Sequence, residues 1–290
     1  MDWKAVDERL IKRGELILDL ESLGNHQKEL ETMNKGRPGP RYKLANSYIN
    51  LLAVVRYLFQ MPYRQLEGYT RALHRLVPEL PTADYSGIRK RILRLQVDPY
   101  RHLSESSDPV AIALDSTGVK VEKAGGWVER KHGKKKRYVK LHFAVNTVTH
   151  EVVSMEVTTD DIHDSKEAAG LLEGAERRAN VEEALLDGAY DSEEVYGELE
   201  RRGIEAVIKP RRNARSDTGS LSRSIAVGMI RELGYGTWAE FTGYGRRWAV
   251  ETAYSTFKRL FGEGAMGRSL SCIALELAGK VALYNLLVNM

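Results

Sequence analysis

Residues 110–118 read VAIALDSTG, five apolar residues that run directly into Asp115. A short unbroken apolar run of this kind is typical of a central strand buried on both faces. The pattern recurs at residues 184–188, ALLDG, where the run leads into Asp187. Each aspartate is therefore expected at the end of its strand, and a carboxylate at the end of a buried strand is costly to desolvate unless a cation meets it. Two such aspartates therefore suggest that they share a cation.

The segments around these runs predict an α/β fold with a mixed sheet flanked by helices. Residues 138–145 and 151–158 alternate like strands and follow the first strand through short links, which indicates an antiparallel meander. Later elements are expected at Ser165–Arg178 (helix), 184–186 (strand), Ser192–Arg202 (helix), Ile204–Ile208 (strand) and Leu270–Val288 (helix). This is the element order of a ribonuclease-H-like fold, in which the first and fourth strands are parallel neighbours. Asp115 and Asp187 are then expected side by side.

The N-terminal part of the chain predicts a separate helical region. Helices are expected at Tyr42–Phe59, Tyr63–Leu76 and from a cap at Thr82 or Asp84 to about Leu95. The third helix carries Arg89 and Arg91, so the order helix, short turn, basic helix resembles a helix-turn-helix reader, although many small helical bundles share this outline. We expect residues 1–108 to form a helical DNA-binding and dimerisation region, and residues 109–290 the catalytic domain.

Positive charge is concentrated in one segment. Residues 120–140 hold nine Lys or Arg and two Glu, a net of +7, whereas the whole chain carries only +4. Its densest part is Lys134, Lys135, Lys136 and Arg137. Such a patch on an otherwise balanced protein suggests a polyanion partner, and the alternative is a solvated hairpin tip.

Composition excludes several classes of protein. A single cysteine, Cys272, excludes a disulfide framework and any multi-cysteine metal site. The N-terminus lacks the pattern of a signal peptide, and no apolar run is expected to reach the length that spans a bilayer. These features predict a cytoplasmic protein without a membrane partner.

A further stretch, residues 244–258, reads YGRRWAVETAYSTFK. On one helix its polar residues Tyr244, Arg247, Glu251 and Lys258 fall within about 60° of one another. Such a stripe is either an ion-paired surface or part of a site, and the two strand-associated aspartates favour a site. Three carboxylates without a Cys/His set suit Mg²⁺ or Mn²⁺ rather than zinc. Two such ions can clamp the attacking and leaving oxygens of a phosphodiester.

These residues resemble DDE-type insertion-sequence transposases. The steps Tyr-x2-Arg-x3-Glu-x6-Lys over residues 244–258 match the signature around the third carboxylate of that family. Residues 187–190 (DGAY) look like its second-acid region, and Asp115 within LDST resembles its first. Residues 62–68 (PYRQLEG) are similar to its N-terminal part, so the resemblance covers about residues 45–290.

The resemblance implies a DNA transposase that cuts and joins DNA at the terminal inverted repeats of an insertion sequence, with two Mg²⁺ or Mn²⁺ ions and a nucleoid-associated homodimer bridging two ends. Asp115, Asp187 and Glu251 would be the catalytic metal ligands. The DNA contacts would come from Tyr244, Arg247, Lys258, Lys134, Lys135, Lys136, Arg137, Arg89 and Arg91. The alternatives are a ribonuclease-H-like host nuclease without strand transfer and a non-catalytic DNA-binding derivative.

Five further residues have competing interpretations. Trp238 and Trp248 could stack on a base near the cut, but packing is the favoured interpretation. Asp164 follows a short stretch that resembles a motif of these enzymes and could be catalytic, and Asp191 lies close to Asp187, but both are expected to cap the helices that follow them. Tyr254 could touch DNA or pack.

Overall fold

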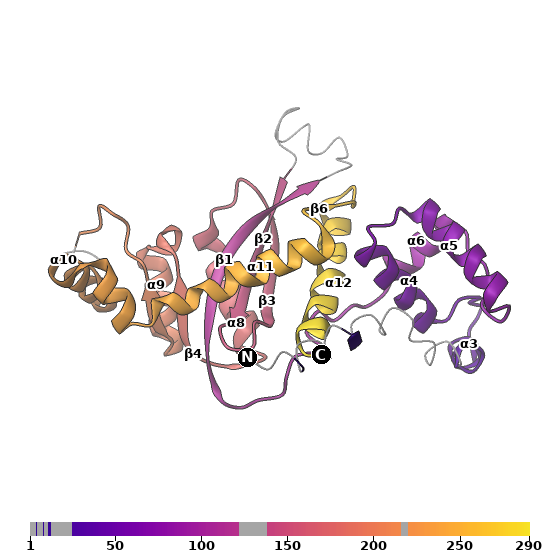
Figure 1. The fold of residues 1–290 in the computed structure, drawn as a ribbon, viewed down its shortest axis with the longest axis horizontal. Helices are drawn as coiled ribbons and strands as arrows, with labels where there is room; N and C mark the ends of the chain where they lie inside the picture. Colours follow the sequence, from indigo (N-terminus) through magenta and orange to yellow (C-terminus); the bar gives the residue numbers. More distant parts are fainter. Residues whose placement is uncertain (1–3, 5–7, 9–10, 13–24, 122–137, 216–219) are drawn as a thin grey trace. The chain divides into compact units, whose positions relative to one another are not determined.

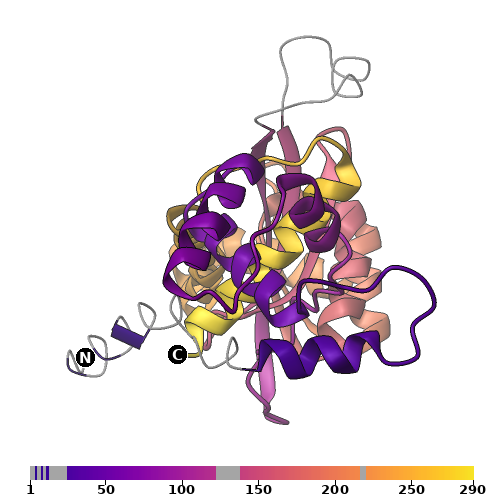
Figure 2. The ribbon, with the colours of Figure 1, turned by 90° about the vertical axis from the view of Figure 1, so that its right-hand side faces the viewer.

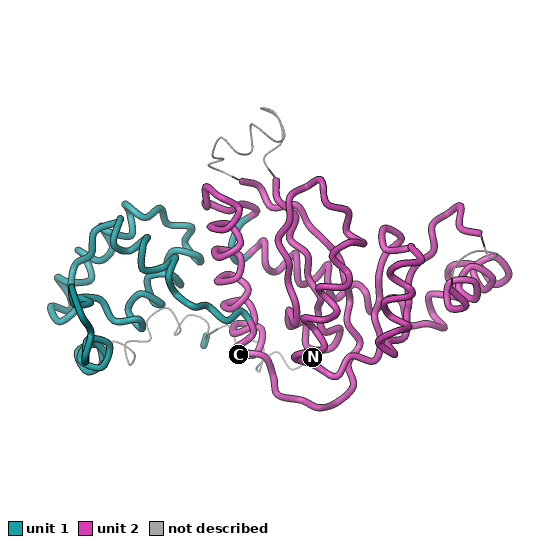
Figure 3. The backbone as a smooth tube through the Cα atoms, turned by 180° about the vertical axis from the view of Figure 1, so that it is seen from behind, with its two compact units in different colours: residues 1–99, 260–262, 290 teal, residues 100–259, 263–289 magenta. Residues whose placement is uncertain are grey.

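The structure is a computed structural model that describes residues 4, 8, 11–12, 25–121, 138–215 and 220–290. It forms two compact units (Figure 3). Unit 1 comprises residues 1–99, 260–262 and 290, and unit 2 comprises residues 100–259 and 263–289. The roles predicted for residues 1–108 and 109–290 stay predictions. Lys134, Lys135, Lys136 and Arg137, the predicted basic tip, lie outside the described residues.

Unit 1 is helical where it is described, and its helices are drawn in indigo to purple in Figure 2. They are α3 (His26–Asn34), α4 (Asn46–Leu58), α5 (Tyr63–Leu76) and α6 (Tyr85–Ile92). Asp84 caps α6, since its carboxylate accepts the backbone N–H groups of Ser86 and Gly87. This helix ends three residues earlier than the predicted Leu95.

Unit 2 is built on a mixed sheet. Its strands are β1 (Pro109–Val121), β2 (Tyr138–Asn146), β3 (Val152–Thr159), β4 (Asn180–Leu186), β5 (Glu205–Ile208) and β6 (Gly264–Ala265). They lie in the order β3-β2-β1-β4-β5, and β6 pairs with the far end of β1. The β1–β2 and β2–β3 pairs are antiparallel, whereas β1–β4 and β4–β5 are parallel. This topology confirms the predicted ribonuclease-H-like sheet.

The two faces of the sheet bury different sets of residues. Ile112 and Leu114 of β1 belong to the cluster that packs against α8 (Asp164–Glu176) and α9 (Glu193–Arg202). Leu185 of β4 points the other way and packs with Trp238 of α10 (Leu221–Phe241) and with Tyr244. Figure 1 shows α11 (Trp248–Phe261) crossing the sheet. Residues one position out of phase with Leu114 and Leu186 therefore share the face that carries Leu185.

Helix α10 contains a break that the sequence did not predict. Gly234 has φ 83° and ψ 158°, a conformation outside the helical region that glycine adopts at low cost. The break lets the second part of α10 approach the sheet independently of the first, and this part carries Trp238.

The expectation that no apolar run reaches bilayer length is wrong for α12 (Leu270–Val288). This helix is long and apolar enough to span a membrane by length and composition, with a mean hydropathy of 1.5. However, 56% of this apolar stretch is buried inside the protein, and the core helix of a globular unit can have the same length and composition. Glu276 and Lys280 form a buried ion pair of 3.1 Å, and Lys280 also donates to the Gly264 carbonyl (2.9 Å). The polar groups of α12 thus hold β6 in place.

Candidate active site

The two strand-associated aspartates lie side by side. In the parallel β1–β4 pair Leu114 is the partner of Leu186, so Asp115 and Asp187 are the next residues along each chain. Both lie in phase with Leu185, on the face of the sheet opposite α8 and α9. The prediction that Asp115 ends its strand is wrong, because β1 continues for six residues beyond it to Val121. Asp187 directly follows β4, as predicted.

Hydrogen bonding and burial have opposite effects on the ionised form of the Asp115 carboxylate. The Ser116 N–H donates to its Oδ1 at 2.7 Å, just as the Ala189 N–H donates to Asp187 Oδ1 at 2.8 Å. Burial raises the pKa of Asp115, and the negative charge of Asp187 raises it further, while the Ser116 N–H and Arg247 partly offset this rise. A buried carboxylate whose pKa is raised, with a second carboxylate beside it, favours a bound cation at this place.

Arg247 supplies positive charge to this place. It is the last residue of the 3₁₀ turn Tyr244–Arg247 (η4), which leads directly into α11. Its Nη1 donates to Asp115 Oδ2 at 3.0 Å, and its Nη2 contacts Glu251 Oε1 one helical turn later. Arg247 therefore links the carboxylates of Asp115 and Glu251 through its two terminal nitrogens. Within the described ranges, no three His, Cys, Asp or Glu side chains are grouped so that they could hold a metal ion.

Two further residues of α11 attach it to the sheet. The Tyr254 hydroxyl lies 2.7 Å from the Asp115 carbonyl oxygen and 3.0 Å from that of Leu141, and its ring stacks on Phe143. Tyr254 thus packs. Lys258 Nζ donates to Thr117 Oγ1 at 2.7 Å. Glu251 and Lys258 thus lie on the side of α11 that faces β1, where the sequence had grouped them.

Tyr244 departs from the predicted helical stripe. It lies in the 3₁₀ turn, whose three residues per turn rotate its side chain away from the α-helical position. Its ring is 6% exposed and packs against Trp238, and its hydroxyl donates to the Leu186 carbonyl at 3.2 Å. This side chain thus supports the end of β4, one residue before Asp187, and it also lines the pocket beside Asp187. The DNA contact of Tyr244 stays a prediction.

Both predicted aspartate caps are wrong. The N-cap residue of α8 is His163, and Asp164 instead accepts a hydrogen bond from Lys140 (2.9 Å). Helix α9 is capped by Ser192. Asp191 is buried and pairs with Arg223 of α10 (2.7 Å). In both cases a tertiary ion pair takes the carboxylate that local reasoning assigned to a helix end.

The remaining predicted residues divide by exposure. Trp238 is 2% exposed, which confirms packing, whereas Trp248 is 67% exposed, so packing is wrong for it. In unit 1 Arg89 is exposed. Arg91 uses its guanidinium within unit 1, donating to the Leu44 carbonyl (2.9 Å) and to Asn46 Oδ1 (2.7 Å).

Sequence reasoning missed a basic pocket beside Asp187. Its volume is about 560 Å³, and its lining includes Asp187, Lys209, Arg211, Arg212 and Arg247. The parallel pairing of β4 and β5 could have predicted this pocket. Because β4 and β5 are parallel with Leu186 opposite Ile208, the residues that follow them emerge at the same edge of the sheet. The basic residues Lys209, Arg211 and Arg212 directly follow β5 and therefore lie beside Asp187.

The family profile of the transposase DDE domain matches residues 106–286 of this chain. The chain belongs to the DDE transposase family. A second profile with the same description matches residues 11–124. Members of this family are DNA transposases, so the chain is an enzyme of that class, and the resemblance seen in the sequence is confirmed.

Similar solved structures include a piggyBac transposase synaptic complex with hairpin DNA, at 9% identity and a TM-score of 0.45 over 92% of this chain and 72% of that one. A Mos1 strand transfer complex is 13% identical, with a TM-score of 0.26 over 80% and 81% of the two chains. A simian T-cell lymphotropic virus intasome is 16% identical, with a TM-score of 0.27 over 72% and 69%. Scores this low add nothing to the assignment, which depends on the family profile and the strand topology.

Proposed function

We propose that Asp115, Asp187 and Glu251 are the catalytic carboxylates of this transposase, and that it cuts and joins double-stranded DNA at the terminal inverted repeats of an insertion sequence. The observation that carries the proposal is the parallel register of β1 and β4, which sets Asp115 beside Asp187. Helix α11 crosses the same face and contributes Glu251, joined to Asp115 through Arg247.

The oxygen donors of the three carboxylates are of the kind that Mg²⁺ or Mn²⁺ prefers, but in this structure Glu251 is paired with Arg247 and is not grouped with the two aspartates. A cation bound by the two aspartates would offset the raised pKa of Asp115, which is caused by burial and by Asp187. Glu251 would complete the ligand set by exchanging its contact with Arg247 for the metal. When bound, two ions activate the attacking water or 3′-hydroxyl and stabilise the departing oxyanion.

The cations of α11 and its leading turn have a complementary role. With Glu251 bound to a metal, the side of the Arg247 guanidinium that now contacts Glu251 would be available to bind phosphate oxygens in a bidentate manner. Lys258, held to Thr117 Oγ1, adds a second positive charge on the same helix. Arg89 and the basic segment with Lys134, Lys135, Lys136 and Arg137 are proposed to bind DNA, in a homodimer that bridges two ends.

The test uses duplexes carrying the terminal repeats found around the gene, with one strand end-labelled. Asp187→Asn and Glu251→Gln should each abolish Mg²⁺-dependent nicking and joining while DNA binding persists, because only metal binding is removed. Asp108→Asn is the matched control, since Asp108 is exposed in the loop before β1.

Each outcome separates the candidates. Nicking and joining by the wild type, both lost in Asp187→Asn, support the proposal. Nicking without joining at any target would indicate the host nuclease. Binding without either reaction would indicate the non-catalytic derivative, and nicking by Asp187→Asn would refute the assignment of the carboxylates.

A further inference from the structure

We infer that the basic pocket beside Asp187 is a binding site for the DNA backbone next to the cut, in which Lys209 and Arg212 hold a phosphate adjacent to the scissile one. The inference rests on the proposed function, because it takes the scissile phosphate to lie at Asp187. It adds a substrate contact that the transposase signature at residues 244–258 does not contain.

The register of the sheet sets the place of this site. Lys209 follows β5 as Asp187 follows β4, and the Lys209 N–H donates to the Leu186 carbonyl at 3.2 Å. The pocket of about 560 Å³ extends from Asp187 along residues 209–212 to Arg247. If a DNA strand runs from the carboxylates in this direction, its next phosphates lie beside Lys209 and Arg212.

The charge of the pocket is not neutralised by the protein. Lys209, Arg211 and Arg212 are exposed, and among the described residues no carboxylate lies within ion-pair distance of any of them. Lys209 Nζ lies over the Tyr235 ring, 4.8 Å from its centre. Three exposed cations around one concave surface, with Asp187 at its rim, are complementary to a polyanion and not to an acidic side chain of this unit.

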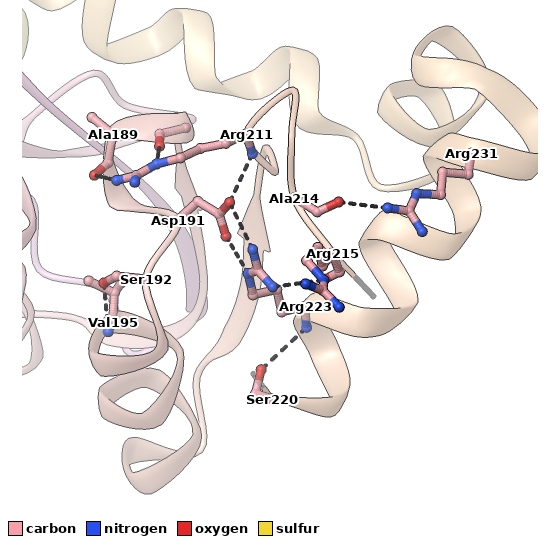
Figure 4. Close-up of polar contacts among 11 residues, drawn as sticks. Ala189, Asp191, Ser192, Val195, Arg211, Ala214, Arg215, Ser220, Arg223 and Arg231 are labelled. Carbon is pink, nitrogen blue, oxygen red and sulfur yellow. Dashed lines mark hydrogen bonds and ion pairs between the residues drawn. The ribbon is translucent and has the colours of Figure 1, made fainter. Parts of the chain in front are cut away.

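Hydrogen bonds of Arg211 and Asp191 fix the segment after β5 that lines the pocket, and Figure 4 shows these contacts. Arg211 Nε donates to the Gly188 carbonyl at 3.0 Å, which joins the segment after β5 to the turn after Asp187. The Arg211 N–H donates to Asp191 Oδ2 at 2.8 Å, and the same carboxylate pairs with Arg223. Arg211 is therefore a positioning residue, which leaves Lys209 and Arg212 as the side chains available for phosphate.

The experiment measures how the DNA affinity of each variant depends on the charge of individual phosphates. Terminal-repeat duplexes are made with a single neutral methylphosphonate at successive positions on both sides of the cleavage site, and affinity is measured in EDTA. Lys209→Ala/Arg212→Ala is compared with the wild type and with Arg177→Ala/Arg201→Ala. The control removes the same charge from α8 and α9, on the opposite face of the sheet. The melting temperature of each variant reports whether its fold is intact.

The wild type and the control should lose affinity when the neutral group lies within a few nucleotides of the cut. The Lys209→Ala/Arg212→Ala variant should bind the unmodified duplex more weakly and be insensitive to the neutral group at those positions. Its plot of log affinity against log salt should be shallower by about 1, since the one duplex phosphate held by this pair contributes about 0.9. A folded variant with the wild-type pattern and slope would overturn the inference.

Nicking of the unmodified duplex by the wild type with Mg²⁺ is scored separately. Its absence counts against the proposed function. A wild type that nicks, together with a double variant that senses the same phosphates, refutes the pocket alone. A wild type that shows no dependence on any phosphate near the cut also overturns the inference.

Discussion

Replacing Asp191 by alanine should loosen the edge of the sheet beside Asp187. The Asp191 side chain is fully buried and that of Arg223 is 13% exposed, with Nε and Oδ1 2.7 Å apart. Removing one partner of a buried ion pair costs about 3–5 kcal/mol, because a charge is left without compensation. Arg223 keeps its hydrogen bond to the Arg215 carbonyl and has some access to water, so we expect the lower end, about 3 kcal/mol.

Hydrogen exchange of the full-length chain, read by mass spectrometry, measures this cost locally. Peptides covering 209–211 and the start of α10 should exchange about 100-fold faster in Asp191→Ala, because a factor of ten corresponds to about 1.4 kcal/mol. Glu173→Ala is the control. It breaks the exposed Glu173–Arg177 pair on α8, for which we expect a change of about 1 kcal/mol or less.

A double-mutant cycle decides whether the ion pair is the cause. Asp191→Ala/Arg223→Ala should be little worse than Asp191→Ala alone, since the uncompensated charge is gone. If the single variant changes local exchange less than tenfold, or if the two substitutions are additive, the pair does not hold this edge of the sheet.

Three further predictions concern the core around the carboxylates. Tyr254→Phe should lower the free energy of unfolding by about 1 kcal/mol in urea titrations, because it removes a buried hydroxyl bonded to the sheet; an unchanged midpoint would argue against that bond. Burial lowers the pKa of His142 to about 4, so the folded protein disfavours its protonation and should lose stability as pH falls from about 6.5 to 4. His142→Gln should lose less over this window in thermal melts, and an equal loss would contradict the assignment. Asp115→Asn should abolish nicking yet melt no lower than the wild type in metal-free buffer at pH 8, because the ionised Asp115 is disfavoured by burial and by Asp187; a clear drop in melting temperature would refute this balance.

The sheet was predictable because its evidence is local and repeated. The apolar runs before Asp115 and Asp187 identify buried strands, and the order of elements is compatible with few topologies. Parallel pairing of the first and fourth strands then brings the two aspartates together without any knowledge of side-chain contacts. Glu251 follows from helical spacing alone, since α11 is regular where this residue lies.

The errors lie where tertiary contacts override local preference. Asp191 precedes a helix like a cap, but its partner is Arg223, 32 residues later, which no local rule can identify. Tyr244 fits a helical stripe only if the chain is α-helical there, and the 3₁₀ turn rotates it into the core. Trp248 is a large aromatic residue of the kind that usually packs in a core, yet its side chain is exposed and lines the basic pocket.

Iron-mediated cleavage of the polypeptide tests the central claim most directly. Fe²⁺ replaces Mg²⁺ at oxygen-ligand sites, and with ascorbate and peroxide it generates radicals that cut the backbone close to the bound ion. We predict cuts near Asp115, Asp187 and Glu251 that excess Mg²⁺ suppresses, that Asp187→Asn abolishes and that Asp108→Asn leaves unchanged. Cuts elsewhere only, or an unaltered pattern in Asp187→Asn, would contradict a metal site built from these three carboxylates.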